Sequence, residues 1–269
     1  QINFNEPIHI YFIGIGGISM SGLAEIVKKE NFKVSGSDMK ESALTNHLNS
    51  LGIQVFIGQQ AENLSADVDV VVYTAAIHED NPEYAEAVRR NLPMLTRAQF
   101  LGQLMKNYQT PIAVSGTHGK TTVTSMITQI LLLNKMEPTA VIGGRLPMIN
   151  SNGIAGKSET MVCEACEFVD TFLQMSPDIS VLLNIDNDHL DYFKTMDNLV
   201  LSFHKFLKMS RKAYINGDDE LCIKAATNTD AEIITFGFSN KNKYYAENIS
   251  AGKFGFCFDV ISDGKKLSS

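Results

Sequence analysis

The chain has 269 residues, of which 44% are hydrophobic and 20% charged, and its formal net charge is −7. This length allows one large or two ordinary folded domains, and the negative charge argues against nucleic acid as a partner, because phosphate backbones require a basic surface. No apolar stretch reaches the roughly 18 residues of a membrane span, and the start QINFNEPIHI lacks the pattern of a secretion signal, so we expect a cytoplasmic protein.

The first predicted elements are a strand, a glycine turn and a helix. The apolar run 8–13 meets Gly14-Ile15-Gly16-Gly17, and a helical pattern follows at 20–30. Glycines let the backbone approach a phosphate, while the helix N-terminus offers free amides and a partial positive charge. The next strand, 32–37, ends at Asp38, which is suited to bind a ribose hydroxyl or a base edge.

Further apolar runs at 53–57 and 68–73 alternate with helix-like stretches. Such alternation predicts an α/β fold with a parallel sheet and helices on both faces. The dinucleotide pattern would require a third glycine at position 19, where this chain has Ser19, so a nicotinamide or flavin cofactor is poorly supported. A tight turn with a purely structural role stays open at this point.

A linker is predicted after the helical run 98–106, where the polar residues 107–110 lead to Pro111. We therefore expect a domain boundary near residue 108, with a first domain at 1–108 and a second at 109–269.

The second domain opens with a strand, the loop GTHGKTT at 116–122, and a helix. This is the order that a phosphate-binding loop requires. Lys120 brings a point charge to the terminal phosphates, and the Thr121 hydroxyl can join a magnesium shell. The general motif has its first glycine at position 114, where this chain has Val114, and Gly116 takes that place in a variant loop.

Two polar residues follow the next predicted strands, 160–163 and 179–183. Glu164 directly follows the first strand, and His189 lies shortly after the second. Because the carboxyl ends of parallel strands form the ligand crevice, both side chains are expected to converge on the phosphate loop and to supply magnesium ligands. Mg²⁺ usually prefers carboxylates and water. On the residues alone, Glu164 is as readily explained as a solvated surface acid, and a helix-cap or core role is favoured over a ligand role for His189.

The last part of the chain shows a helix and a strand. The run 197–212 has apolar residues at helical spacing and is predicted to be a core helix, with His204 and Lys205 on the surface. The run 256–261 is predicted to be a strand that ends in a turn.

Six segments together resemble the Mur ligases. They are GIGGISMSGLA (14–24), SGSD (35–38), TAAIHEDNPE (74–83), GTHGKTT (116–122), CEACE (163–167) and NIDNDHLDYF (184–193). GTHGKTT is typical of the whole family, whereas the first segment and the Asn-Pro-Glu segment resemble the members that join L-alanine to UDP-N-acetylmuramic acid. Agreement in the family's order along nearly the whole chain is far more specific than one motif.

The resemblance implies a Rossmann-like UDP-sugar domain followed by a P-loop-type ATPase domain with a mostly parallel sheet. Family members also have a C-terminal domain that helps to bind the amino acid. No counterpart of it is visible, so we expect the chain to end inside the central domain and to bind ligands without turnover.

The resemblance also implies roles for individual residues. UDP-sugar binding falls to Gly14, Gly16, Gly17, Ser19, Met20 and Asp38. ATP binding falls to Gly116, Thr117, His118, Gly119, Lys120, Thr121 and Thr122. Catalytic roles fall to Lys120, Glu164 and His189, and magnesium ligation to Thr121, Glu164 and His189. Many relatives have an aspartate where this chain has Cys166, which makes Glu167 a second acidic candidate.

The implied reaction uses ATP and Mg²⁺ in the synthesis of peptidoglycan precursors. The muramic acid carboxylate attacks the γ-phosphate, and the alanine amine then displaces phosphate from the acyl phosphate. Lys120 and the magnesium ions are expected to absorb the negative charge. A ligase that recycles murein tripeptide onto the same UDP-sugar and a non-catalytic nucleotide-binding module are the alternatives.

Overall fold

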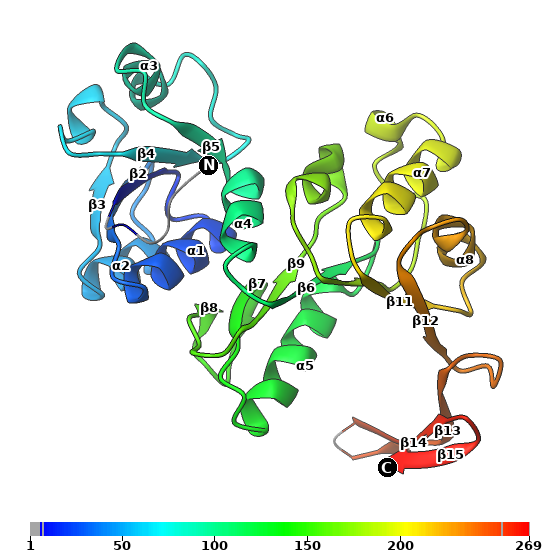
Figure 1. Cartoon of the computed structure of the whole chain (residues 1–269). Coiled ribbons are helices and arrows are strands. Elements are labelled where there is room, and N and C mark those ends of the chain that lie inside the picture. Colours follow the sequence, from blue (N-terminus) through cyan, green and yellow to red (C-terminus); the bar gives the residue numbers. More distant parts are fainter. Residues whose placement is uncertain (1–5, 7, 254, 269) are drawn as a thin grey trace. The chain divides into compact units, whose positions relative to one another are not determined.

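The computed structural model describes residues 6, 8–253 and 255–268 and confirms the predicted α/β class (Figure 1). In this part of the chain no helix is long and apolar enough to cross a membrane. The residues form two compact units. Unit 1 comprises the residues up to Pro111, Thr121–Glu164 and Gln174–Ser176, and unit 2 comprises Ile112–Lys120, Ala165–Leu173 and the residues from Pro177 onward.

Unit 1 contains a parallel sheet with the strand order β3-β2-β1-β4-β5. Its strands are β1 (His9–Ile13), β2 (Lys33–Asp38), β3 (Gln54–Ile57), β4 (Val70–Tyr73) and β5 (Met94–Thr96). All of β1 is buried, because it lies at the centre of the sheet, and this explains its unbroken apolar sequence. The strand order reverses between β1 and β4, and ligands of open α/β sheets bind at such a reversal.

Four helices accompany this sheet, and their starts are set by local capping. They are α1 (Ile18–Lys29), α2 (Ala43–Ser50), α3 (Pro82–Arg89) and α4 (Arg97–Met105). Asn81 caps α3 by accepting hydrogen bonds from two backbone amides, and Pro82 is its first residue. Ser42 and Thr96 form capping boxes that start α2 and α4. Helices α1 and α2 lie side by side (Figure 1).

Unit 1 also includes a second group of elements, α5 (Lys120–Leu133), β7 (Thr139–Leu146), β8 (Ser151–Ile154) and β9 (Thr160–Glu164). Strand β7 pairs antiparallel with β8 and parallel with β9. Helix α1 packs against β8 at two glycines, where a Cβ atom on Gly153 would lie 2.7 Å from the Cα atom of Gly22. Only a residue without a side chain fits there, so these glycines allow α1 to approach the β7–β8 hairpin closely.

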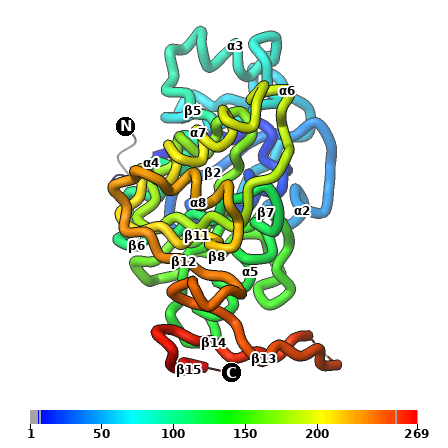
Figure 2. The backbone as a smooth tube through the Cα atoms, turned by 90° about the vertical axis from the view of Figure 1, so that its right-hand side faces the viewer, coloured from blue at the N-terminus to red at the C-terminus, as the bar shows by residue number. Residues whose placement is uncertain are grey.

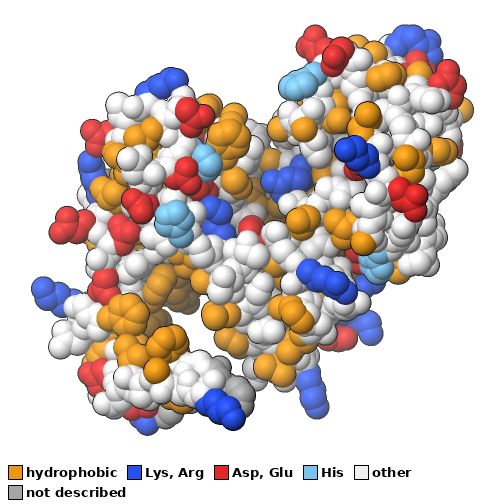
Figure 3. Space-filling model, turned by 180° about the vertical axis from the view of Figure 1, so that it is seen from behind, with side chains coloured by type: hydrophobic (Ala, Val, Ile, Leu, Met, Phe, Trp, Pro, Cys, Tyr) orange, Lys and Arg blue, Asp and Glu red, His pale blue; other side chains and the backbone are white. Residues whose placement is uncertain are grey.

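Unit 2 contains the parallel strands β6 (Thr110–Ser115), β10 (Ile179–Leu182), β11 (Lys212–Asn216) and β12 (Glu232–Gly237). The strands β13 (Tyr244–Gly252), β14 (Gly255–Ser262) and β15 (Lys265–Ser268) are joined as an antiparallel lobe. The lobe projects away from β10–β12 in two views (Figures 1 and 2). Hydrophobic side chains gather over it at the lower left of Figure 3. Phe256 and Leu267 of the lobe are exposed.

The helical segments of unit 2 are η2 (Phe168–Gln174), α6 (Leu190–Phe193), α7 (Met196–Leu207) and α8 (Glu220–Ala226). The predicted helix 197–212 is too long, because α7 ends at Leu207 and Lys212 already begins β11. The Ser210 hydroxyl bonds to the Leu207 carbonyl and to Ser180 of β10, which ends the helix and leads the chain into the sheet. His204 is half-buried rather than a simple surface residue, since its Nδ1 lies 2.9 Å from the Ala225 carbonyl.

A buried carboxylate connects two strands of unit 1 with α3. Glu83 is 0% exposed and accepts hydrogen bonds from the Tyr11 hydroxyl at 2.9 Å and from the Asn63 amide at 2.7 Å. The Ser37 hydroxyl donates to its second oxygen at 2.5 Å. Burial raises the pKa of Glu83, and these donors partly offset that effect by stabilising the charged form.

We predict that Glu83→Ala destabilises the chain by about 3 kcal/mol, because it leaves several buried donors without an acceptor. Denaturant unfolding measures the loss. Glu86→Ala is the matched control, since this carboxylate lies on the same helix but pairs with the exposed Arg89. Equal stability of the two variants would contradict the role of the buried network.

Candidate functional site

A crevice of about 500 Å³ opens in unit 1 beyond the ends of β1, β2 and β4. Its lining residues are Gly14, Gly17, Asp38, Met39, Gln59, Thr74, Ala76, Ile77, His78, Asp80 and Asn81. The crevice therefore lies where the strand order reverses, which is the expected place for a ligand. Three residues proposed from the sequence, Gly14, Gly17 and Asp38, are brought together in it.

The glycine turn is shaped for a close approach by a ligand. Gly14 has φ +82°, a conformation that favours glycine, and its amide donates to the Ser37 carbonyl at 2.8 Å. The Gly16 amide donates to the Asp38 carboxylate at 2.9 Å, and a Cβ atom on Gly16 would lie 2.8 Å from that carboxylate. The Gly16 amide therefore orients the Asp38 carboxylate, and Gly16 itself does not line the crevice.

The start of α1 supplies the electrostatic part of this site. No side chain caps the N-terminus of α1 at Gly17, so its first amides are available to an anion. Ser19 and Met20 do not line the crevice, and Met20 is almost fully buried. The crevice residues between positions 74 and 81 were not proposed as binding residues from the sequence, although the segment follows β4 and belongs to one of the quoted motifs.

The phosphate loop of unit 2 is held in shape by Asn184. Gly116 has φ +140° and Gly119 has φ +84°, so both positions favour glycine. The His118 amide donates to the Asn184 side chain at 2.8 Å, and the Asn184 amide donates back to the His118 carbonyl at 3.0 Å. The Thr117 amide donates to the Asn184 backbone carbonyl at 3.1 Å. This residue follows β10 and was not identified from the sequence.

Lys120 folds back over its own loop onto a buried carboxylate. Its ammonium group donates to the Gly116 carbonyl at 2.6 Å, to the Thr117 carbonyl at 3.2 Å, and to the two Glu167 oxygens at 2.9 and 3.1 Å. Glu167 is almost fully buried. A buried carboxylate without a partner is costly, so Glu167 and Lys120 depend on each other. Glu167 is therefore more central than its secondary place in the sequence analysis suggests.

His189 also lies near Glu167. It precedes α6 in a left-handed conformation with φ +55°, and its Nε2 is 4.0 Å from Glu167 Oε1. Its ring packs at a tilt against Phe168, with 4.8 Å between the ring centroids. The structure thus brings Lys120 and His189 to the same carboxylate.

Thr121 and Glu164 are in direct contact within unit 1. The Thr121 hydroxyl donates to Glu164 Oε2 at 3.1 Å, and the Gly143 amide donates to Oε1. A hydroxyl and a carboxylate are oxygen ligands of the kind that Mg²⁺ prefers, so this pair fits the ion. His189 belongs to unit 2, and its joint ligation with Glu164 stays a prediction. Within the described ranges, no three His, Cys, Asp or Glu side chains are gathered as a metal site.

Two protein-family models match the sequence of the chain. "Mur ligase family, catalytic domain" matches residues 9–109, and "Mur ligase middle domain" matches residues 114–269. The UDP-N-acetylmuramate–L-alanine ligase of Agathobacter rectalis is 49% identical over 93% of this chain and 55% of that protein. The ligase of the same name from Clostridium acetobutylicum is 47% identical over 96% of this chain and 57% of that protein. The chain thus spans little more than half the length of these relatives.

Solved structures with the same fold include two ligases. UDP-N-acetylmuramate-alanine ligase from Thermotoga maritima has a TM-score of 0.83 at 30% identity, covering 97% of this chain and 59% of its own. UDP-N-acetylmuramate:L-alanyl-γ-D-glutamyl-meso-diaminopimelate ligase from Neisseria meningitides has a TM-score of 0.85 at 27% identity, covering 97% of this chain and 86% of its own.

We predict that Gly116→Ala destabilises the chain more than Gly255→Ala. Both glycines have φ near +140°, so both variants carry a backbone penalty of about 1–3 kcal/mol. Only at Gly116 would the new Cβ meet neighbours, 3.0 Å from Leu183 Cβ, whereas nothing lies within 4 Å at Gly255. Overpacking should add about 1 kcal/mol, and equal denaturation midpoints would refute this reading of the loop.

Proposed function

Because this chain belongs to the Mur ligase family, we propose that it acts in the ATP-dependent joining of L-alanine to UDP-N-acetylmuramic acid. The observation that carries the proposal is the presence, in one chain, of an anion-binding crevice at a sheet reversal and a lysine-bearing phosphate loop. The reaction needs two nucleotides, and the chain offers a suitable place for each. This activity belongs to the synthesis of peptidoglycan precursors.

The crevice of unit 1 suits the UDP moiety. Gly14 and Gly17 allow the diphosphate to approach the backbone, and the uncapped start of α1 provides amides for its oxygens. The Asp38 carboxylate is suited to accept hydrogen bonds from ribose hydroxyls. A volume of about 500 Å³ lies within the range of small-molecule sites.

The phosphate loop of unit 2 suits the triphosphate of ATP. On binding, the Lys120 ammonium would exchange the carbonyls of its own loop and Glu167 for terminal phosphate oxygens. Glu167 would then keep the His189 ring beside it, since His189 Nε2 lies 4.0 Å from Glu167 Oε1. Because phosphoryl transfer is helped mainly by positioning and by charge neutralisation, Lys120 is the catalytic group that contributes most from this loop.

Thr121 and Glu164 are the residues that would hold magnesium, and His189 is proposed as a further ligand. When bound there, Mg²⁺ would neutralise phosphate charge and orient the transferred group. Thr121 directly follows Lys120, so the metal ligand and the lysine are held by the same turn of backbone at the start of α5.

The proposed chemistry has two steps. A carboxylate oxygen of the muramic acid bonds to the γ-phosphorus while the bond to the β-phosphate oxygen breaks, which gives an acyl phosphate and ADP. The L-alanine amine then bonds to the acyl carbon, loses a proton, and phosphate leaves. Lys120 neutralises the charge on the transferred phosphoryl group in the first step.

The alternative is the ligation of murein tripeptide onto the same UDP-sugar. The fold does not favour either reading, because TM-scores of 0.83 and 0.85 are obtained for the two kinds of ligase. Sequence identity supports the alanine reading, since curated relatives named for L-alanine reach 46–49%, against 27% for the tripeptide ligase structure.

We predict that the chain binds UDP-N-acetylmuramic acid in calorimetric titration and gives no signal with NADH. Asp38→Asn should weaken binding by about ten-fold, since hydrogen bonds to a charged acceptor are worth more than 1 kcal/mol. Asp67→Asn, an exposed aspartate that pairs with Lys33, is the control. Binding of NADH instead of the UDP-sugar would contradict the assignment of the crevice to the UDP moiety.

We also predict that Lys120→Ala weakens binding of a non-hydrolysable ATP analogue with Mg²⁺ by about 10- to 100-fold, through the loss of charge-assisted hydrogen bonds. The double variant Lys120→Ala/Glu167→Gln avoids an unpaired buried carboxylate and should show the same loss. Lys205→Ala, on the exposed side of α7, should bind normally. Unchanged affinity in the folded double variant would contradict the proposed ATP site.

A further inference from the structure

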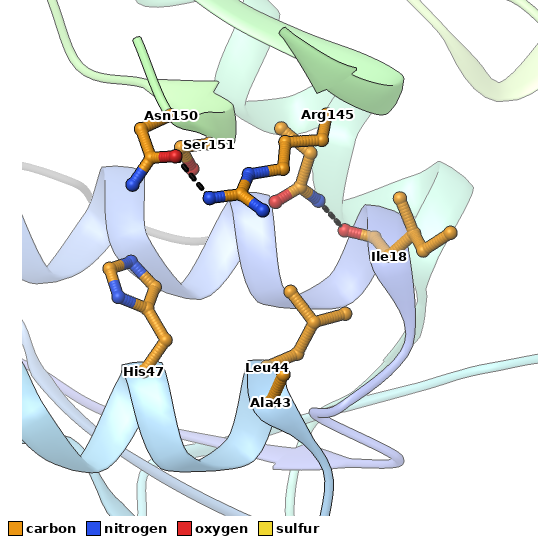
Figure 4. A pocket seen from close by; sticks show the side chains of 8 residues that line it. Ile18, Ala43, Leu44, His47, Arg145, Asn150 and Ser151 are labelled. Atoms are coloured by element: carbon orange, nitrogen blue, oxygen red, sulfur yellow. Dashed lines mark hydrogen bonds between the residues drawn. The ribbon is translucent and has the colours of Figure 1, made fainter. Parts of the chain in front are cut away.

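A second cavity in unit 1, of about 320 Å³, has no part in the proposed function. It lies between the start of α1, the helix α2 and the turn of the β7–β8 hairpin (Figure 4). Its lining residues are Ile18, Ala43, Leu44, His47, Arg145, Asn150, Ser151 and Asn152. None of them lines the crevice that is proposed to bind UDP. The cavity is therefore a distinct place where a small molecule can be enclosed.

Arg145 gives the cavity a positive charge. Its guanidinium group points into the space between the hairpin and α2 (Figure 4), and one nitrogen donates to the Asn150 side chain. No ion pair of Arg145 with a carboxylate is found among the residues that the structure describes. An arginine has five N–H donors in a planar fork, so several donors stay available to an anionic ligand.

His47 lies on the α2 side of the cavity, opposite Arg145 (Figure 4). Its carboxylate partner, Glu25, is buried. His47 projects from α2 toward the hairpin (Figure 4), with Nε2 3.4 Å from Glu25 Oε1. Glu25 is only 4% exposed, and the Ser151 hydroxyl lies 3.2 Å from each of its oxygens. The buried carboxylate is therefore already satisfied within the protein, while Arg145 remains in the lining.

The lining also has an apolar side, formed by Ile18, Ala43 and Leu44. Ile18 is 50% exposed, and Leu44 is half-buried beside it. The Asn152 side chain donates to the Ile18 carbonyl and lies 3.3 Å from the Ser21 hydroxyl, which fixes the hairpin to α1. The glycine contact between α1 and β8 reinforces this connection. The apolar wall suits a ligand with a short hydrocarbon part.

We propose that this cavity binds a small organic anion, a carboxylate or a phosphate ester with a short branched apolar body. The anionic group meets the Arg145 guanidinium, and the hydrocarbon part packs on Ile18 and Leu44. A volume of about 320 Å³ is at the small end of known ligand sites, which suits a small molecule. The site is separate from the crevice, although Ile18 directly follows Gly17 in the chain.

Three probes that share the 3-methylbutyl group test the proposal: 4-methylpentanoate, isoamyl phosphate and isoamyl alcohol. Titrations of the chain are followed by NMR shifts of backbone amides near the cavity. We expect the two anions to bind and the neutral alcohol to bind at least about ten-fold more weakly, because it lacks a charge-assisted hydrogen bond. The comparison of the two anions tells which head group the site prefers.

Arg145→Gln should weaken binding of both anions by about ten-fold. Lys157→Gln is the matched control, since this exposed lysine lies in unit 1 outside the cavity, and it should leave their affinities unchanged. Equal binding of the alcohol, or normal anion binding by folded Arg145→Gln, would overturn the proposal. Displacement of a bound anion by UDP-N-acetylmuramic acid would show that the cavity belongs to the UDP-sugar site, and would overturn its separate role.

Discussion

The buried ion pair between Lys120 and Glu167 is the interaction on which the proposed catalytic part of the molecule depends. Its lysine closes the phosphate loop through two backbone carbonyls, and its carboxylate is almost fully buried. Removing one partner of such a pair is far more costly than the pair's net contribution to stability. In the proposed function a phosphate replaces this contact, and the His189 ring already lies beside the carboxylate.

Anion binding in this chain does not require a basic surface. The chain carries a net charge of −7, yet glycine turns, a free helix start and single cations can each hold a phosphate or carboxylate locally. In the proposed sites, the start of α1 would hold the anion in the crevice, Lys120 would hold it in the loop, and Arg145 would hold it in the smaller cavity. Because each of these features is local, the proposed anion sites are compatible with the negative net charge of the chain.

Sequence patterns predicted those strands that are buried on both faces, because such strands have continuous runs of apolar residues. The strands β1, β4, β6 and β10 were found in this way, and the motifs that follow them lie where parallel strands end. The strands β7, β8, β11 and β12 were not predicted. Two adjacent glycines interrupt β7 and another lies in β8, so propensity argues against strands there. In β7 and β8, pairing with each other and with β9 outweighs this local preference.

Individual site residues were predictable only where the motif itself carries the chemistry. Lys120 and Asp38 were proposed because strand, turn and charge occur together in the sequence. Asn184 and Glu167 gained their roles from contacts across 66 and 47 positions of the chain, which no local pattern encodes. The cavity around Arg145 was missed for the same reason, since its walls come from two helices and a hairpin far apart in the sequence.

The most direct test of the account is to follow the Glu167 carboxyl carbon by NMR while the chain is titrated with a non-hydrolysable ATP analogue and Mg²⁺. The account predicts that this resonance shifts as Lys120 leaves it, and that the Lys120 ammonium signal changes at the same nucleotide concentration. If the analogue binds and neither resonance moves, the lysine does not exchange Glu167 for phosphate, and the central claim is contradicted.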